Sequence, residues 1–125
     1  MATRLKTSKR TEEIFLHIGQ NLGLQPFALS KIAIALSLKE NKKITPEDLN
    51  TDSNGIELNR QTIVGEYDSL FTSMIAFNEK TELRDDQIFP NLFKAHIDRG
   101  AILLEREYRY DKKFYTHLSN LQKGL

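Results

Sequence analysis

Non-basic and basic residues alternate near the start of the chain. Thr3, Leu5 and Thr7 alternate with Arg4 and Lys6, a period-two pattern that predicts a short strand. A helical pattern then begins at Ser8 or Thr11, either of which can accept hydrogen bonds from the free amides of a first turn. The apolar positions of this helix are Ile14, Phe15, Ile18 and Leu22. We therefore expect a basic, strand-like arm over residues 1–10 that leads directly into a helix.

A second helix follows after a short turn. Gly23 is suited to end the first helix, and Pro26 is suited to open the next one. The apolar residues of this second helix cover most of its sides and are Phe27, Leu29, Ile32, Ala33, Leu36 and Leu38. A helix this apolar should lie in the centre of the core or in an oligomer interface. The order of arm, helix, turn and helix is shared with ribbon-helix-helix DNA-binding proteins, whose paired strands lie in the major groove.

The middle of the chain predicts a connection and then a third helix. Residues 41–58 form the connecting loop, in which residues 45–48 suit one helical turn and residues 56–59 suit an extended segment. The third helix runs from about residue 62 to residue 79. Its apolar residues, which we expect on the buried side, are Val64, Leu70, Phe71, Met74, Ile75 and Phe77. Gly65 in the first turn is costly in a helix, so we expect the backbone to be closely packed there.

The last part of the chain predicts one long helix. It opens after Pro90 and reaches Tyr110 or continues beyond it. Its core face consists of Leu92, Phe93, Ile97, Ala101, Leu104 and Tyr108. Residues 111–125 carry Phe114, Leu118 and Leu121 at helical spacing, which predicts a final amphipathic segment. The fold class is therefore mainly α: one compact domain over residues 1–125, with a helical hairpin after the arm and two or three further helices.

Charge is distributed unevenly along the chain, although the net charge is only +1. Residues 1–43 hold eight Lys and Arg against three Asp and Glu, and residues 44–90 hold three against ten. Residues 91–125 hold seven against four. Such a chain can present one basic face, or its helices can mix these charges into an ordinary surface.

Composition and motifs favour a protein without chemistry of its own. The chain has no cysteine, which excludes disulfides, thiolate metal sites and cysteine nucleophiles and suits a cytoplasmic location. We find no secretory signal, no apolar run of membrane-spanning length, no phosphate-binding glycine loop and no nucleophile motif. His17, His96 and His117 are scattered, and the one second ligand near them is Asp98, two residues after His96. On a helix the side chains of His96 and Asp98 point apart, which argues against a metal site there. We therefore expect a protein that is not an enzyme, with no cofactor, no metal and no membrane partner.

The basic arm is the clearest sign of a binding function. Its four cations, Arg4, Lys6, Lys9 and Arg10, could neutralise several DNA phosphates. Further lysines on or after the second helix extend this set: Lys31, Lys39, Lys42 and Lys43. No array of side chains suited to reading bases accompanies them, so backbone binding is favoured over sequence recognition. The alternative is that the arm is only a solvated, charged terminus.

A second candidate lies on the long helix, in the segment HIDRG. His96 and Arg99 are three residues apart, so one helix face can present both side chains to a phosphate. The alternative is that Arg99 pairs with an acid such as Glu66 or Asp68 while His96 is buried. Gly100 favours this alternative, because a glycine inside a helix indicates tight packing.

Two longer segments resemble a known family. The stretch GIELNRQTIVGEYDSLF, residues 55–71, and the stretch AHIDRGAILLE, residues 95–105, resemble DndE, the small E component of the Dnd DNA phosphorothioation system. The family pattern falls on Gly55, Glu57, Asn59, Arg60, Thr62, Gly65 and Glu66, whereas Leu58 stands where the family has an aromatic residue. A basic start, a helix ending in GL, and an apolar helix closing in SLKE extend the resemblance over nearly the whole chain.

The resemblance implies an accessory, DNA-associated subunit without a cofactor. It implies a homo-oligomer, a tetramer, that works with other Dnd proteins, which carry the sulfur and nucleotide chemistry. Because sulfur insertion needs an accessible or interrupted backbone, we hypothesise that nicked or strained duplex DNA is the ligand. A ribbon-helix-helix-like repressor and a protein–protein adaptor within the modification complex remain the alternatives.

The resemblance leaves the role of the family-pattern residues open. Asn59 could cap the third helix, and Arg60 could pair with Glu66 or with a neighbouring subunit. The functional alternative is that Arg60 and Arg99 converge on one phosphate.

Overall fold

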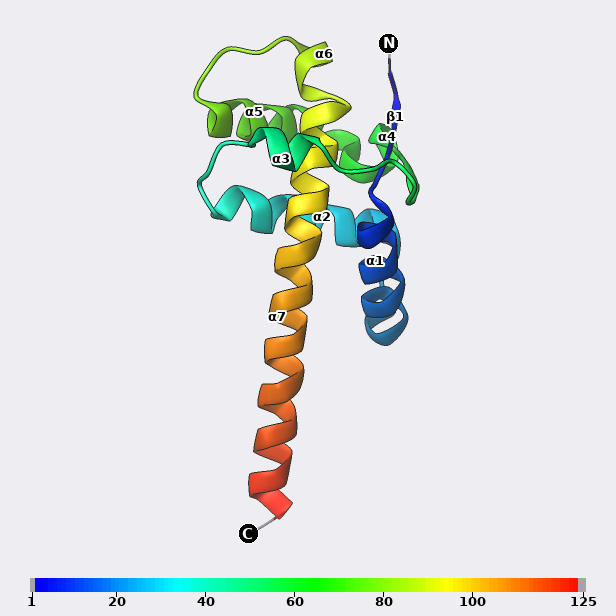
Figure 1. Ribbon diagram of the computed structural model, residues 1–125, viewed down its shortest axis with the longest axis vertical. Helices are drawn as coiled ribbons and strands as arrows, with labels where there is room; N and C mark the ends of the chain where they lie inside the picture. The colour runs from blue at the N-terminus through cyan, green and yellow to red at the C-terminus, as the bar shows by residue number, and fades with distance from the viewer. Residues whose placement is uncertain (1, 124–125) are drawn as a thin grey trace.

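The computed structural model describes the backbone of residues 2–123 and the side chains of residues 2–109. One long helix runs through the molecule and the other elements are arranged around its first half (Figure 1). In chain order the elements are β1 (Arg4–Lys6), α1 (Lys9–Leu22), α2 (Pro26–Lys39), α3 (Pro46–Leu49), β2 (Glu57–Asn59), α4 (Arg60–Val64), the 3₁₀ helix η1 (Gly65–Tyr67), α5 (Asp68–Glu79), α6 (Asp85–Ile88) and α7 (Asn91–Lys123). The predicted mainly helical class is confirmed.

The start of the chain follows its local sequence signals closely. Ser8 caps α1, and its side chain accepts a hydrogen bond from the backbone N–H of Thr11. Gly23 ends this helix in the left-handed region at φ 70°, and Pro26 opens α2. The arm is a strand, as predicted, but β1 pairs antiparallel with β2 of the same chain. Ribbon-helix-helix dimers instead pair the strands of two chains.

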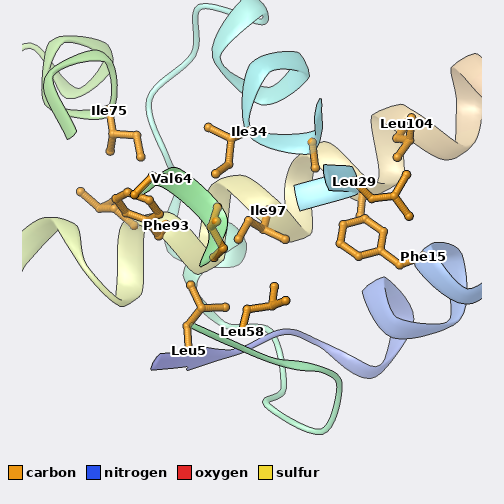
Figure 2. Close-up of a cluster of buried hydrophobic side chains, with 14 of the residues drawn as sticks. Leu5, Phe15, Leu29, Ile34, Leu58, Val64, Ile75, Phe93, Ile97 and Leu104 are labelled. Atoms are coloured by element: carbon orange, nitrogen blue, oxygen red, sulfur yellow. The ribbon is translucent and has the colours of Figure 1, made fainter. Parts of the chain in front are cut away.

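The hydrophobic core lies where α2 crosses α7. From this crossing it extends toward α1 on one side and toward α5 on the other (Figure 2). Leu5 and Leu58, which are register partners in the ribbon, cover one side of it. Gly100 sets the distance between the two helices, because a Cβ atom there would lie 1.7 Å from the carbonyl oxygen of Ala33. The tight packing expected at this glycine is confirmed.

The predicted third helix is wrong as a single element. The chain forms α4, then one 3₁₀ turn, then α5, and the break falls at Gly65, which adopts φ 50°. The expectation of close backbone packing there is also wrong, since an added Cβ would meet nothing within 4 Å. The glycine is required for its positive φ, which other residues adopt only at a cost.

The buried side predicted for this helix is correct only in part. Val64 and Ile75 are buried in the core. By contrast, the exposed fractions of Leu70, Met74 and Phe77 are 54%, 37% and 83%. Helical spacing identified an apolar face on α5. The core covers only the side of α5 that carries Ile75, and it leaves the side with Leu70, Met74 and Phe77 exposed.

The long helix confirms the predicted core face. Five of the predicted residues are buried and Tyr108 is half-buried against them. The helical backbone continues to Lys123. The amphipathic pattern predicted for residues 111–125 falls outside the described side chains. No single helix among the described residues is long and apolar enough to cross a membrane, and the combination of α1 with α2 that reaches the length is bent by 111°.

The close crossing of α2 and α7 gives a first prediction. Gly100→Ala should lower the free energy of unfolding by about 2 kcal/mol or more, because the methyl group overpacks a contact between two backbones. Urea denaturation measures this loss. Gly23→Ala is the control: its Cβ would have open space, so only its positive φ is penalised, at about 1 kcal/mol. Equal losses in the two variants would contradict the packing role of Gly100.

Candidate nucleic-acid interface

A buried carboxylate on α7 fixes the position of the basic N-terminal elements. Asp98 is 5% exposed, and its Oδ1 accepts hydrogen bonds from the backbone N–H of Ser8 at 3.0 Å and from the hydroxyl of Thr11 at 2.7 Å. Its Oδ2 accepts from the hydroxyl of Thr51 at 2.6 Å and from Lys94 Nζ at 2.8 Å. The start of α1 and the loop before β2 are therefore tied to the same point of α7.

Sequence reasoning missed this role of Asp98. It was considered only as a metal partner for His96, and was rejected because the two side chains point apart. The available signal was weak: an acid on the apolar part of a helix, four residues after Lys94, which suits an i,i+4 ion pair. The three donors outside α7 come from positions far away in the chain, so no local pattern shows them.

The N-terminal basic group consists of Arg4, Lys6, Lys9 and Arg10, and all four are exposed. Arg4 lies 3.8 Å from Glu57 on the neighbouring strand, and Arg10 Nη2 lies 2.8 Å from Glu105 on α7. Lys9 forms an ion pair with Glu12, and this hydrogen bond raises the pKa of Lys9. The backbone N–H of Lys9 donates to Asp52 at 2.8 Å, a second link to the loop before β2.

A second set of cations lies at the other end of α2. The loop basic group consists of Lys39, Lys42 and Lys43, which are all exposed. Figure 1 shows the loop after α2 and the strand β1 on opposite sides of α7. Lys31 belongs to neither group: it is half-buried, with Nζ 5.8 Å from the centre of the Phe27 ring. The structure therefore divides the predicted basic residues between two faces.

Arg99 holds the loop that carries the second group. Its guanidinium donates to the hydroxyl of Ser37 at 2.8 Å, to the Ser37 carbonyl at 3.0 Å, and to the carbonyls of Lys42 and Lys43 at 3.0 and 3.2 Å. An acid of the middle segment completes the set, but it is Asp48, at 3.6 Å, rather than the predicted Glu66 or Asp68. Arg99 therefore positions the loop.

His96 is a core residue. It is fully buried, and its Nδ1 lies 2.8 Å from the hydroxyl of Ser37. Since that oxygen already accepts from Arg99, we assign its proton to the bond with His96, which leaves the ring N–H on Nε2. That nitrogen has no hydrogen-bond partner among the described residues. Burial and the nearby charge of Arg99 lower the pKa of His96 to about 4, so the ring is neutral near pH 7.

Arg60 donates more hydrogen bonds to carboxylates than any other cation in the described part of the chain. Its guanidinium donates two hydrogen bonds to Asp68, at 2.7 and 2.8 Å, and two to Asp85, at 2.8 and 2.7 Å. It also lies over the rings of Phe89 and Phe93, with its central carbon 5.1 and 5.8 Å from their centres. Asp85 and Asp68 raise the pKa of Arg60, and in return Arg60 lowers the pKa of Asp85.

The expected convergence of Arg60 and Arg99 on one phosphate is wrong. Arg60 joins α4 to α5, α6 and the start of α7, whereas Arg99 faces the end of α2 and the loop after it. The pairing of Arg60 with Glu66 is also wrong, since Glu66 is exposed and the two carboxylates are Asp68 and Asp85.

Asn59 and Gly55 of the family pattern also stabilise the fold. Asn59 caps α4, as predicted, by accepting a hydrogen bond from the N–H of Gln61 at 2.8 Å. Gly55 lies so close to the start of α1 that a Cβ would be 2.1 Å from the carbonyl oxygen of Ser8. Glu57 faces Arg4, while Thr62 is exposed. No cluster of three potential metal ligands occurs in the described part of the chain.

The fold and its surface define a class: a small helical protein that displays two groups of cations on opposite sides of one long helix. Residues 4–112 match the family model of DNA sulphur modification protein DndE, and the chain therefore belongs to the DndE family. The family predicted from the sequence segments is confirmed.

Solved structures of this family share the fold. The crystal structure of DndE from Escherichia coli B7A, involved in DNA phosphorothioation modification, aligns with a TM-score of 0.67 and 19% identity, covering 83% of this chain and 97% of that one. The structure of a DndE mutant in which glycines are replaced by lysine aligns with a TM-score of 0.66 and 17% identity, covering 83% and 98%. A search of curated proteins found no match.

The arginine cluster gives a second prediction. Arg60→Ala should lower the free energy of unfolding by about 2 kcal/mol at pH 7, because two carboxylates lose their shared partner; their partial exposure keeps the loss below that of a fully buried pair. The loss should be full above pH 3.8, the ordinary carboxyl pKa, and should shrink as the pH falls below it toward the lowered pKa that Asp85 owes to Arg60. Denaturation at pH 7 and pH 3.5 measures both effects.

Arg84→Ala is the matched control for this cluster. Arg84 pairs with Asp86, but the two side chains are 74% and 72% exposed, so we expect a loss of less than about 0.5 kcal/mol. An Arg60→Ala variant no less stable than this control would contradict a structural role for Arg60.

The buried histidine gives a third prediction. An unfolded histidine binds a proton near pH 6.5, whereas folded His96 resists protonation down to about pH 4. The unfolded state therefore binds more protons in this window, and stability should fall by up to about 3 kcal/mol as the pH drops from 6.5 to 4. His96→Asn should remove this part of the pH dependence, whereas replacing the exposed His17 should not.

Nuclear magnetic resonance checks the same group without relying on a variant. The His96 ring signals should stay constant from pH 8 to about pH 5. Titration of this ring near pH 6.5 in the folded protein would show that His96 is not a neutral core residue.

Proposed function

We propose that this chain is a non-catalytic accessory subunit of the DNA sulfur modification machinery that binds the DNA backbone. The observation that carries the proposal is the N-terminal basic group, whose four cations lie on a strand and a helix start fixed by Asp98 and by the β1–β2 pairing. The proposal includes a cytoplasmic location and no cofactor. Other Dnd proteins are the expected partners and supply the sulfur chemistry.

The geometry of the arm suits a series of phosphates. In β1 the residues alternate between exposed and buried, so Arg4 and Lys6 point to one face while Leu5 enters the core. Residues two apart on a strand are separated by about 6.6 Å, which lets each cation contact a different phosphate. Lys9 and Arg10 continue this surface in the first turn of α1.

Energetics separates binding cations from structural ones. Arg4, Lys9 and Arg10 are exposed, and each forms a surface ion pair of the weak kind that DNA phosphates can replace. Arg60 and Arg99 are mostly buried and hold several partners each. We therefore place these two arginines outside the DNA-binding surface, although the sequence had suggested both.

We further propose that the chain forms a homo-oligomer, a tetramer. The apolar residues Leu22, Leu24, Phe27 and Ile32 around the turn from α1 to α2 are 54%, 37%, 38% and 38% exposed. Such a patch is typical of a protein interface. An oligomer would also bring several basic groups together, which would lengthen the contact with DNA.

Backbone binding is favoured over a ribbon-helix-helix repressor. In that class the strand pairs with its counterpart in a second chain, whereas β1 already pairs with β2 here. The DNA-binding experiment described next also tests the alternative that the protein is a protein–protein adaptor.

The fourth prediction concerns the arm. The triple variant Lys6→Ala, Lys9→Ala, Arg10→Ala should weaken duplex binding, and the slope of log K against log salt should become shallower by about 2–3. Fluorescence anisotropy over a salt series measures both. The triple variant Lys39→Ala, Lys42→Ala, Lys43→Ala is the matched control, because it removes the same charge from the opposite face.

The controls also separate the alternatives. If arm and loop variants lose the same affinity, the arm has no special role; if the arm variant binds unchanged, the arm is a solvated terminus. Undetectable DNA binding at low salt would favour the adaptor. Equal affinity for intact and nicked duplexes of one sequence would contradict the preference for a nick.

A further inference from the structure

A carboxylate on α7 lies between two arginines that come from different helices. Glu105 Oε1 accepts a hydrogen bond from Arg10 Nη2 at 2.8 Å, and its Oε2 lies 3.6 Å from Arg109 Nη2. Arg10 is in the first turn of α1, which runs beside α7 (Figure 1), whereas Arg109 is one turn after Glu105 on α7 itself. Two guanidinium groups therefore converge on one anionic group, an arrangement that also suits a phosphate.

The three side chains are covered to different degrees. The Glu105 side chain is 19% exposed, whereas the side chains of Arg10 and Arg109 are 54% and 67% exposed. An anion that approaches from solvent therefore meets the two arginines before it meets the carboxylate. The bond to Glu105 uses one of the five N–H donors of Arg10, so this guanidinium keeps donors for a second anion.

A cavity of about 420 Å³ lies beside this cluster, between α1 and α7. Both arginines border it, and Ile14 and Ile18 give it an apolar lining. Apolar walls lower the local dielectric constant, which strengthens the attraction between a guanidinium and a phosphate at the rim. Glu13 also borders the cavity but is exposed, so Glu105 is the acid that the two arginines share.

The surroundings of Arg10 and Arg109 differ from those of the arginines that hold the fold. Arg60 and Arg99 are mostly buried and bind oxygen atoms from several segments. Arg10 and Arg109 are exposed and meet at a single carboxylate, which another anion can replace without breaking the fold. Residues 91–125 hold seven Lys and Arg against four Asp and Glu, and the N-terminal basic group includes none of these cations.

We propose that Arg10 and Arg109 form a phosphate subsite at the rim of this cavity, which the Glu105 carboxylate occupies when no DNA is bound. A backbone phosphate of DNA takes the place of the carboxylate, and the glutamate side chain turns toward solvent. Arg10 belongs both to the N-terminal basic group and to this subsite, so the path of the DNA continues from the arm across α1 onto α7. Glu105 is an internal competitor that lowers the affinity for DNA. This inference rests on the proposed binding of the DNA backbone.

The first experiment removes the competitor. Glu105→Gln keeps the size of the side chain and releases both guanidinium groups, so the full chain should bind a duplex about 3- to 10-fold more tightly in fluorescence anisotropy at one salt concentration. Glu107→Gln is the matched control, because it removes the same charge from an exposed position of α7. Salt screens such a charge, so we expect a gain of less than about twofold. Equal gains in the two variants would overturn the proposal.

The second experiment removes the new contact. Arg109→Ala should weaken duplex binding, and the slope of log K against log salt should become shallower by about 1, because one phosphate contact is lost. Arg84→Ala removes the same charge from a side chain that is 74% exposed and precedes α6, far from the cavity along α7. This control should leave the slope unchanged. An unchanged slope for Arg109→Ala would overturn the subsite.

Combining the changes tests whether Glu105 acts through the arginines. Glu105→Gln should tighten binding less in the Arg109→Ala variant than in the original chain, because only Arg10 is then released. The same gain in both backgrounds would show a general charge effect and overturn the proposal.

The same measurements separate the subsite from the proposed function. If the arm variant loses affinity while Glu105→Gln and Arg109→Ala bind like the original chain, the subsite is wrong and backbone binding by the arm stands. If the original chain does not bind duplex DNA even at low salt, both are wrong.

Discussion

The structure depends most on one buried charge, the Asp98 carboxylate in the middle of α7. An unpaired carboxylate in the interior would cost several kcal/mol, so its position is tolerated only because both oxygens accept hydrogen bonds. The donors come from the start of α1, from the loop before β2 and from α7 itself. The carboxylate therefore requires these three segments to meet. Since the basic arm leads into this junction, the orientation of its cations follows from the same requirement.

Two kinds of arginine and lysine are found in this protein, and their surroundings separate them. Arg60 and Arg99 are used as connectors, because a guanidinium can hold several oxygens from different segments at once. The cations of the arm and of the loop after α2 are exposed. Arg60, the one cation of the family pattern, belongs to the first kind. A sequence motif can thus identify the family through an internal connection of the fold.

Local chemistry was predictable from the sequence and long-range chemistry was not. The caps at Ser8 and Asn59, the left-handed end at Gly23 and the core face of α7 were all predicted, since each depends on residues within one or two turns. The break at Gly65 was missed because a glycine in a helical pattern can serve either packing or a positive φ. The network of Asp98 was missed because its partners lie up to 90 residues away.

The exposed face of α5 shows a different limit. Periodicity identifies which side of a helix is apolar, but it does not tell whether the protein's own core has room for it. In α5 two sides are apolar, and a core built around α2 and α7 covers only one of them.

The contact between Gly100 and the backbone of Ala33 has a consequence for the shape of any assembly. Two helices in backbone contact cannot slide or roll past each other without a clash, so α2 is held at one angle to α7. The outer surface of α2 carries apolar side chains, and α7 runs the length of the molecule. The direction in which the chain would present that surface to any partner is therefore set by the absence of a single methyl group.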